Sequence, residues 1–137
     1  MQITGQCFCG LLAYEAELDE NMVGLCHCRD CQIFSGSAFR TSGIVPPGNF
    51  RFTQGTPKHF DKVVDSGSVR RMAFCGECGS HLCSFPSEEE GGFVSIRVAS
   101  SHQFDKLKPK TEFFCDSRVA WWPGLEDSAE FPRMFPR

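Results

Sequence analysis

The chain has 137 residues, a formal net charge of −3 and 23% charged residues, a balance typical of one soluble globular domain. It contains no run of basic residues, which argues against nucleic-acid binding, and no apolar stretch long enough to span a membrane. The first ten residues, MQITGQCFCG, lack the positive and apolar segments of a signal peptide, so we expect a cytoplasmic protein.

Short strand-like runs separated by turn residues follow one another along the chain and predict a mainly β, antiparallel fold. The DSG sequence at 65–67 predicts a hairpin turn, and the sequences RDCQIFSG and HQFDKL each predict a short helical turn. We expect a single domain over residues 1–137, in which 126–137 is a surface tail without an element of its own. The runs are 11–18, 22–26, 38–45, 50–54, 58–64, 68–75, 81–85, 93–100 and 111–117.

Nine cysteines are the most informative feature of the composition. In a cytoplasmic chain they indicate metal binding or catalysis rather than disulfides, and an odd number cannot pair completely. Two cysteines, Cys83 and Cys115, stand apart from the others. The other seven form three local clusters, which are Cys7-x-Cys9, Cys26-x-Cys28-x-x-Cys31 and Cys75-x-x-Cys78.

Two of these clusters are pairs that can complete each other. Cys7 and Cys9 lie two residues apart, so an extended chain directs both side chains to one face. Cys75 and Cys78 lie in CGECG, a zinc-knuckle pattern whose glycines permit positive φ. Together the two pairs predict a closed four-cysteine zinc site, which would clamp the N-terminal strand to the later hairpin and stabilise the fold.

Cys26, Cys28 and Cys31 then remain as three thiolates with one open position, the ligand set of a reactive zinc. His27 is a poor fourth ligand, because a residue between two ligands of an extended segment points to the opposite face. With three ligands, this site is expected to lose its metal more easily than the first. Two alternatives stay open: an exchange of pairs that joins Cys26 and Cys28 to Cys75 and Cys78, or closure of the site by His81, Cys83 or Cys115.

Four segments, in this order along the chain, resemble the glutathione-dependent formaldehyde-activating enzyme family, also called the centromere protein V family. This resemblance implies an Mss4-like β fold with two zinc ions, and a reaction that joins glutathione and formaldehyde as S-hydroxymethylglutathione. By the same resemblance, Cys7, Cys9, Cys75 and Cys78 hold a structural zinc, and Cys26, Cys28 and Cys31 hold the second. The segments are GQCFCG (5–10), CHCRDCQIFSGSAF (26–39), RMAFCGECGSHL (71–82) and SRVAWWPGLEDSAEFP (117–132).

Three thiolates make zinc a weak Lewis acid, which suits a soft fourth ligand such as a thiol better than water. We therefore expect a carbon–sulfur lyase-like enzyme that forms or splits an adduct of glutathione, or another thiol, and an aldehyde, with Cys26, Cys28 and Cys31 acting through zinc. Arg29 lies inside the cysteine loop and is the candidate for substrate binding, whereas Arg40 is expected to be solvated. The alternative function is a non-catalytic zinc module that binds a thiol ligand or a protein partner.

Overall fold

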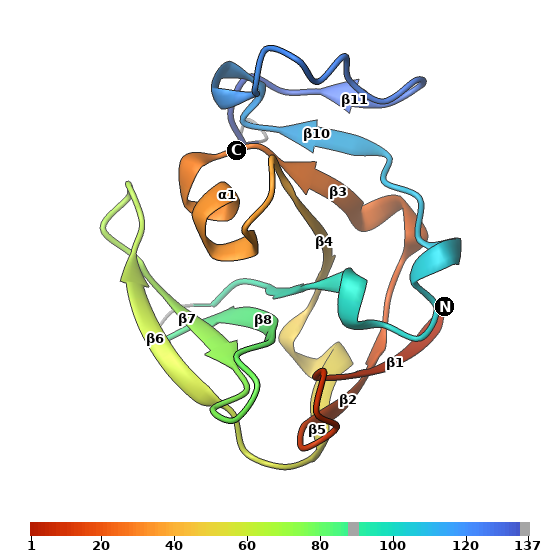
Figure 1. The fold of residues 1–137 in the computed structure, drawn as a ribbon, viewed down its shortest axis with the longest axis vertical. Coiled ribbons are helices and arrows are strands. Elements are labelled where there is room, and N and C mark those ends of the chain that lie inside the picture. The colour runs from red at the N-terminus through yellow and green to blue at the C-terminus, as the bar shows by residue number, and fades with distance from the viewer. Residues whose placement is uncertain (88–90, 135–137) are drawn as a thin grey trace.

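Two β-sheets organise the protein in a computed structural model, which describes residues 1–87 and 91–134 (Figure 1). The mostly β architecture confirms the predicted fold class. No helix in these residues is both long and apolar enough to cross a membrane. The strands are β1 (Gln2–Gln6), β2 (Ala13–Glu17), β3 (Val23–Cys26), β4 (Arg40–Val45), β5 (Phe50–Gln54), β6 (Lys58–Val63), β7 (Val69–Phe74), β8 (His81–Pro86), β9 (Val94–Ile96), β10 (Thr111–Phe113) and β11 (Ala129–Glu130).

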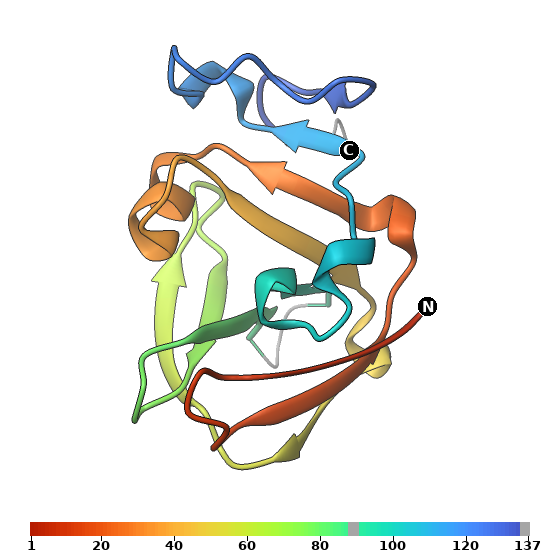
Figure 2. The same cartoon turned by 45° about the vertical axis from the view of Figure 1, so that its right-hand side comes forward.

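The smaller sheet has the order β1-β2-β5 and is antiparallel, and the larger one has the order β11-β10-β3-β4-β9-β8-β7-β6. Figure 2 shows that the larger sheet curves, so that β6 and β7 stand at a steep angle to β3 and β4. One α-helix, α1 (Arg29–Ser35), follows β3. Short 3-10 helices connect the other elements, namely η1 (Glu20–Met22), η2 (Pro47–Asn49), η3 (Val98–Ser100), η4 (Phe104–Lys106) and η5 (Cys115–Ser117).

All three predicted local structures are confirmed, and the helical turn predicted at HQFDKL is η4. The hairpin of β6 and β7 turns at the DSG sequence, where Gly67 takes a φ of +87° and Val63 pairs with Val69. The predicted helical turn at RDCQIFSG is α1, which ends at Gly36 with a φ of +64°. A left-handed φ suits glycine because it has no Cβ to clash with the backbone.

The last strands depart from the antiparallel expectation. β10 pairs in parallel with both β3 and β11. Parallel neighbours need a long connection, and most of the chain lies between β3 and β10. The expectation that the tail forms no element was wrong for β11, because Ala129 pairs with Thr111 and Glu130 with Glu112. The free edge of β10 offers backbone groups with which the tail can pair.

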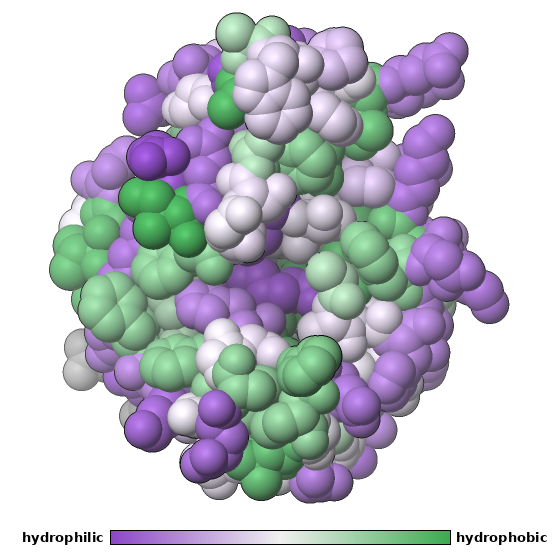
Figure 3. All heavy atoms as spheres, in the orientation of Figure 1, coloured by the Kyte–Doolittle hydropathy of each residue, from purple (hydrophilic) through white to green (hydrophobic). Residues whose placement is uncertain are grey.

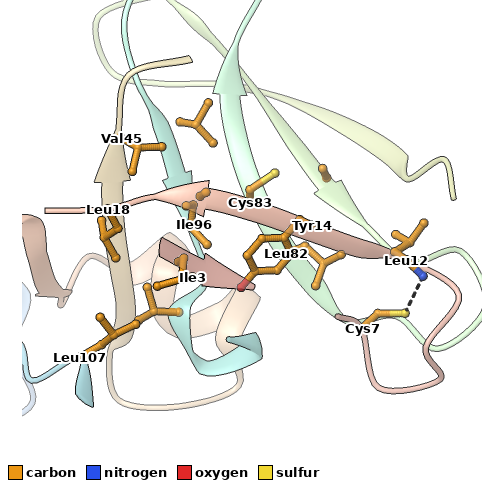
Figure 4. Packing of buried hydrophobic residues seen from close by; sticks show 14 of the residues in the cluster. Ile3, Cys7, Leu12, Tyr14, Leu18, Val45, Leu82, Cys83, Ile96 and Leu107 are labelled. Atoms are coloured by element: carbon orange, nitrogen blue, oxygen red, sulfur yellow. Dashed lines mark hydrogen bonds between the residues drawn. The ribbon is translucent and has the colours of Figure 1, made fainter. Parts of the chain in front are cut away.

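A hydrophobic core fills the space between the two sheets (Figure 4). Ile3 and Tyr14 come from the smaller sheet, while Leu82, Cys83 and Ile96 come from the larger one, and all five are almost completely buried. The hydroxyl of Tyr14 lies 2.9 Å from the Oγ of Ser100, so its one polar group is satisfied inside the core. This core fixes the turns at the ends of both sheets, where the cysteine clusters lie.

Candidate metal centres

Four cysteines from two distant turns come together at what we call the first centre. The Sγ atoms of Cys7, Cys9, Cys75 and Cys78 all lie within 4.8 Å of one another. Cys9 is 3.6 Å from Cys7 and 3.7 Å from Cys75, sulfur to sulfur. In a zinc tetrahedron with Zn–S bonds of about 2.3 Å, the sulfurs lie about 3.8 Å apart. The four thiols therefore fit a zinc ion, with two ligands from the β1–β2 turn and two from the β7–β8 turn.

Both turns of the first centre have the same backbone design. Gly10 N donates to Cys7 O at 3.1 Å, and Gly79 N donates to Cys75 O at 2.9 Å. The two glycines have φ angles of +80° and +75°. A side chain at either position would be strained, because L-residues rarely adopt this conformation. The glycine after each cysteine pair thus allows the chain to bend tightly around the sulfurs.

The pKa is lowered for two of the four thiols of this centre, Cys7 and Cys78, whereas burial and the other three sulfurs raise the pKa of Cys9 to about 12. Leu12 N donates to Cys7 Sγ at 3.2 Å, and Glu77 N donates to Cys75 Sγ at 3.4 Å. Ser80, through its side chain and its backbone, lowers the pKa of the Cys78 thiol to about 5. Because metal binding requires deprotonated thiols, the donors to Cys7 and Cys78 prepare these two sulfurs for a cation.

Cys26, Cys28 and Cys31 form the second centre, with all three Sγ atoms within 4.8 Å of one another. Cys26 ends β3, Cys28 caps α1, and Cys31 lies in the first turn of α1. Among residues 1–87 and 91–134, no further histidine, cysteine or carboxylate joins this group. The alternative ligands left open by the sequence, and the exchange of pairs between the two centres, are therefore not the arrangement found in this part of the chain.

Protons are shared unequally among the three sulfurs of the second centre. Hydrogen bonding with Cys26, and to a smaller extent with Cys31, lowers the pKa of the Cys28 thiol. Hydrogen bonding with Cys28 and with Cys31 raises the pKa of Cys26. Cys31 N also donates to Cys28 Sγ at 3.3 Å, and the positive charge of Lys62 acts in the same direction. Cys28 is therefore the first of the three to become a thiolate.

His27 points away from the second centre, as expected for a residue between two ligands. Its Nε2 lies 2.7 Å from the Oε2 of Glu112, and both side chains are fully buried. Glu112 also accepts hydrogen bonds from Trp122 Nε1 at 3.0 Å, Leu125 N at 2.6 Å and Ser128 Oγ at 3.0 Å. Sequence reasoning missed Glu112, and the only available signal was an acidic residue inside the apolar run TEFF.

The pKa of Glu112 reflects two opposed effects. Burial raises it, but the hydrogen bonds from Leu125 N, His27, Trp122 and Ser128 outweigh burial and lower the pKa to about 2. His27, Glu112 and Cys115 also lie close enough together to suggest a metal site. We do not assign one, because the carboxylate oxygens of Glu112 already accept these four hydrogen bonds.

The two arginines near the second centre differ in their surroundings. Arg29, the predicted substrate-binding residue, begins α1 and is exposed, and its Nη1 lies 3.5 Å from the Oε1 of Gln32. The expectation that Arg40 is solvated was wrong, because its Nε and Nη1 atoms are buried. Arg40 lies opposite Cys26 in the ladder between β3 and β4, and this position turns it inward.

Comparison with known proteins identifies two similarities. The sequence model of the family described as "Glutathione-dependent formaldehyde-activating enzyme" matches residues 2–117. A crystal structure of a Rhodobacter sphaeroides protein, a structural genomics target, resembles the chain with a TM-score of 0.56 and 18% sequence identity. That match covers 71% of this chain and 85% of the other, and at this identity it shows the fold alone. A search of curated proteins found no match.

Proposed function

Because the chain belongs to the glutathione-dependent formaldehyde-activating enzyme family, we propose that it forms or splits an adduct between glutathione, or a related thiol, and an aldehyde. In the forward direction a carbon–sulfur bond forms, the thiol gives up its proton, and the carbonyl oxygen becomes a hydroxyl. The reverse reaction breaks the same bond and returns the proton to sulfur. This is carbon–sulfur lyase chemistry, carried out in this proposal by residues 1–137 as one cytoplasmic zinc domain.

The three-sulfur set of the second centre is the observation that supports this proposal. Cys26, Cys28 and Cys31 converge, and no fourth histidine, cysteine or carboxylate of the described residues joins them. Zinc held by three thiolates keeps one position for a soft ligand, which a thiol substrate can fill as its thiolate. In the same proposal Cys7, Cys9, Cys75 and Cys78 hold a structural zinc, since a four-cysteine set leaves no position for a substrate.

The surrounding residues would hold the second centre in a fixed geometry. The hydrogen bond between His27 and Glu112 anchors the backbone between Cys26 and Cys28 from the opposite face. Cys28 also caps the first turn of α1, so the position of its sulfur is coupled to the helix that carries Cys31. Ligands held by packing and by outer hydrogen bonds keep their orientation when a substrate arrives.

Exchange spectroscopy by NMR tests the proposed activity directly. We expect the zinc-loaded protein to accelerate the interconversion of glutathione plus an aldehyde with their adduct, for formaldehyde or a larger aldehyde. Cys28→Ser should abolish the acceleration, whereas Cys115→Ala, a change outside both centres, should retain it. If no aldehyde shows acceleration, the protein is a non-catalytic zinc module that binds a thiol ligand or a partner.

Counting the sulfur ligands of zinc tests the same proposal without an activity assay. X-ray absorption on the reduced protein with two zinc ions should give an average of about three and a half sulfurs per zinc, from four in one centre and three in the other. An average of four without added thiol would contradict a position that is open to substrate.

A further inference from the structure

A pocket of about 800 Å³ opens beside the first centre and α1. Cys7 and Phe8 of the β1–β2 turn line it on one side, and Phe34 of α1 lines it on another. The lining also includes two arginines and a histidine, namely Arg40 at the start of β4, Arg97 after β9, and His81 at the start of β8. The face drawn in Figure 3 is hollowed near its centre, where hydrophilic side chains lie among hydrophobic ones.

Arg97 is a buried cation with unused hydrogen-bond donors. Its side chain is only 4% exposed, and its Nη1 donates to the O of Ser95 at 2.9 Å and to the Oγ at 2.8 Å. Its Nε and Nη2 atoms are buried and have no partner among residues 1–87 and 91–134. Burying guanidinium nitrogens without hydrogen-bond partners is costly, so this arrangement indicates a site for a ligand that accepts hydrogen bonds, such as an anion.

Arg40 supplies a second cation to the same pocket. Its Nε and Nη1 are buried and without a partner in the described part of the chain, and the same holds for the Nδ1 of His81. No carboxylate within the described ranges forms an ion pair with Arg40 or Arg97, although the protein as a whole is acidic. Five buried donor or acceptor atoms without a partner thus belong to three side chains of residues that line the pocket.

The charge states leave the pocket positive at neutral pH. Burial, and then the positive charge of Arg40, lower the pKa of Arg97 to about 9, which still keeps its guanidinium protonated at pH 7. Burial, and then Arg97 and Arg40, lower the pKa of His81, which favours its neutral form. Two arginines and a neutral imidazole are a suitable set of partners for one carboxylate, which can accept from both guanidinium groups.

The pocket and the second centre are adjacent. Arg40 lies directly opposite Cys26 in the antiparallel ladder between β3 and β4, so the two side chains lie on the same face of the sheet. The sulfur of Cys31 is close enough to interact electrostatically with both Arg40 and Arg97. Two such neighbouring sites suit a ligand with a sulfur at one end and a carboxylate at the other.

We propose that Arg40 and Arg97 bind a carboxylate of the thiol substrate, while the sulfur of the substrate lies at Cys26, Cys28 and Cys31. This inference rests on the proposed function and narrows the substrate class to thiols that carry a carboxylate, of which glutathione is one. Neutral thiols of the same size lack the group that compensates the two buried charges, so they bind more weakly. The arginines are positioning residues for the substrate.

Two small thiols test this inference on the zinc-loaded protein by isothermal titration calorimetry. 3-Mercaptopropionate should bind about 10- to 100-fold more tightly than 3-mercapto-1-propanol, because charge-assisted hydrogen bonds to a buried arginine have this strength. Arg40→Gln should reduce the preference to less than about threefold. Arg51→Gln, on the exposed face of β5, removes the same charge far from the pocket and is the matched control.

Several outcomes would overturn the inference. One is that the wild type binds both thiols with equal affinity. Another is that Arg51→Gln lowers the preference for 3-mercaptopropionate as much as Arg40→Gln does. A loss of preference in Arg29→Gln alone would place the anion site at the start of α1 instead. If Arg40→Gln does not fold, Arg40→Lys replaces it in the test. Lysine keeps the positive charge but cannot donate two parallel hydrogen bonds to a carboxylate. An unchanged preference for 3-mercaptopropionate in Arg40→Lys would contradict the proposed binding of the carboxylate by Arg40.

Propionate alone distinguishes this inference from the proposed function. If propionate binds to the wild type and not to Arg40→Gln, while neither thiol binds more tightly than propionate, the carboxylate site is supported and the thiol chemistry is not. If both thiols bind with equal affinity and propionate does not bind, the thiol site is supported and the carboxylate site is rejected.

Discussion

The Nε2 of His27 lies 2.7 Å from the Oε2 of Glu112, and this contact joins the second centre to the C-terminal part of the chain. His27 lies between two ligand cysteines, and Glu112 lies on β10, between β3 and β11. Three further donors to Glu112 come from residues 122–128. One buried carboxylate therefore connects the cysteine loop of the second centre to the segment that follows β10.

Glu112→Gln should lower the free energy of unfolding by about 2–4 kcal/mol, because a buried charged acceptor is replaced by an amide that turns one N–H group toward donors. Urea unfolding at pH 7 measures the change. The control is Glu15→Gln, which removes an exposed carboxylate that pairs with Arg51 and should cost less than about 1 kcal/mol. Equal losses of unfolding free energy in the two variants would contradict a larger contribution from the buried carboxylate than from an exposed one.

The contribution of Glu112 to stability should depend on pH. Its pKa of about 2 in the folded protein lies below the ordinary value of 4.5. A lowered pKa means that the stabilisation is fully present above pH 4.5 and is lost as the pH falls from 4.5 toward 2. The difference in unfolding free energy between the wild type and Glu112→Gln should therefore shrink over this interval. A difference that stays constant down to pH 3 would contradict the lowered pKa.

Cys78→Ser and Cys28→Ser are matched changes of half-buried cysteines in the two centres. Each should reduce the zinc content from two ions to one. Cys78→Ser should also lower the thermal midpoint strongly, because the first centre joins two distant turns and metal binding contributes directly to folding. Cys28→Ser should lower the thermal midpoint less, because the three cysteines of the second centre lie within one short segment of the chain. Cys83→Ala, a core change outside both centres, should keep two zinc ions.

Chelation should remove the two zinc ions at different rates. The second centre offers three thiolates and the first offers four, so we expect one equivalent to be released quickly and the other slowly. A colorimetric zinc indicator measures the two phases after a chelator is added. Added glutathione should slow the fast phase if a thiol completes the second centre, and a single phase for both ions would contradict unequal ligand sets.

Gly5→Ala tests the packing between the smaller sheet and the core. A Cβ at this position would overlap the ring and hydroxyl of Tyr14 and the carbonyl oxygen of Ser100. We expect a loss of about 1–3 kcal/mol or more in unfolding free energy, as for other overpacked cores. Gly48→Ala is the control, because a Cβ there meets no atom within 4 Å and should change stability by less than about 0.5 kcal/mol.

Local signals in the sequence predicted much of this fold. The hairpin of β6 and β7 follows from a turn sequence between two strand-like runs, and α1 follows from RDCQIFSG. The clustering of seven cysteines also follows from spacing, because pairs separated by one or two residues must lie close together. These features depend on contacts between near neighbours, which the sequence displays directly.

Features that depend on distant contacts were not predictable in the same way. The burial of Glu112 has only a weak local signal, its place in the run TEFF, because its partners Trp122, Leu125 and Ser128 come from a later turn. Arg40 was expected in solvent, and only its pairing with Cys26 across two strands turns it toward a pocket. Parallel pairing of β10 likewise depends on where the intervening chain brings it.

The two centres also differ in when a growing chain can assemble them. Cys26, Cys28 and Cys31 leave the ribosome almost together, whereas Cys9 must wait for Cys75, which follows 66 residues later. The cost of closing a loop grows with its length, so the local cluster has the entropic advantage until the sheets have formed. We therefore expect the nascent chain to take up its first zinc at the second centre, the one that we also expect to hold its metal less firmly in the finished protein.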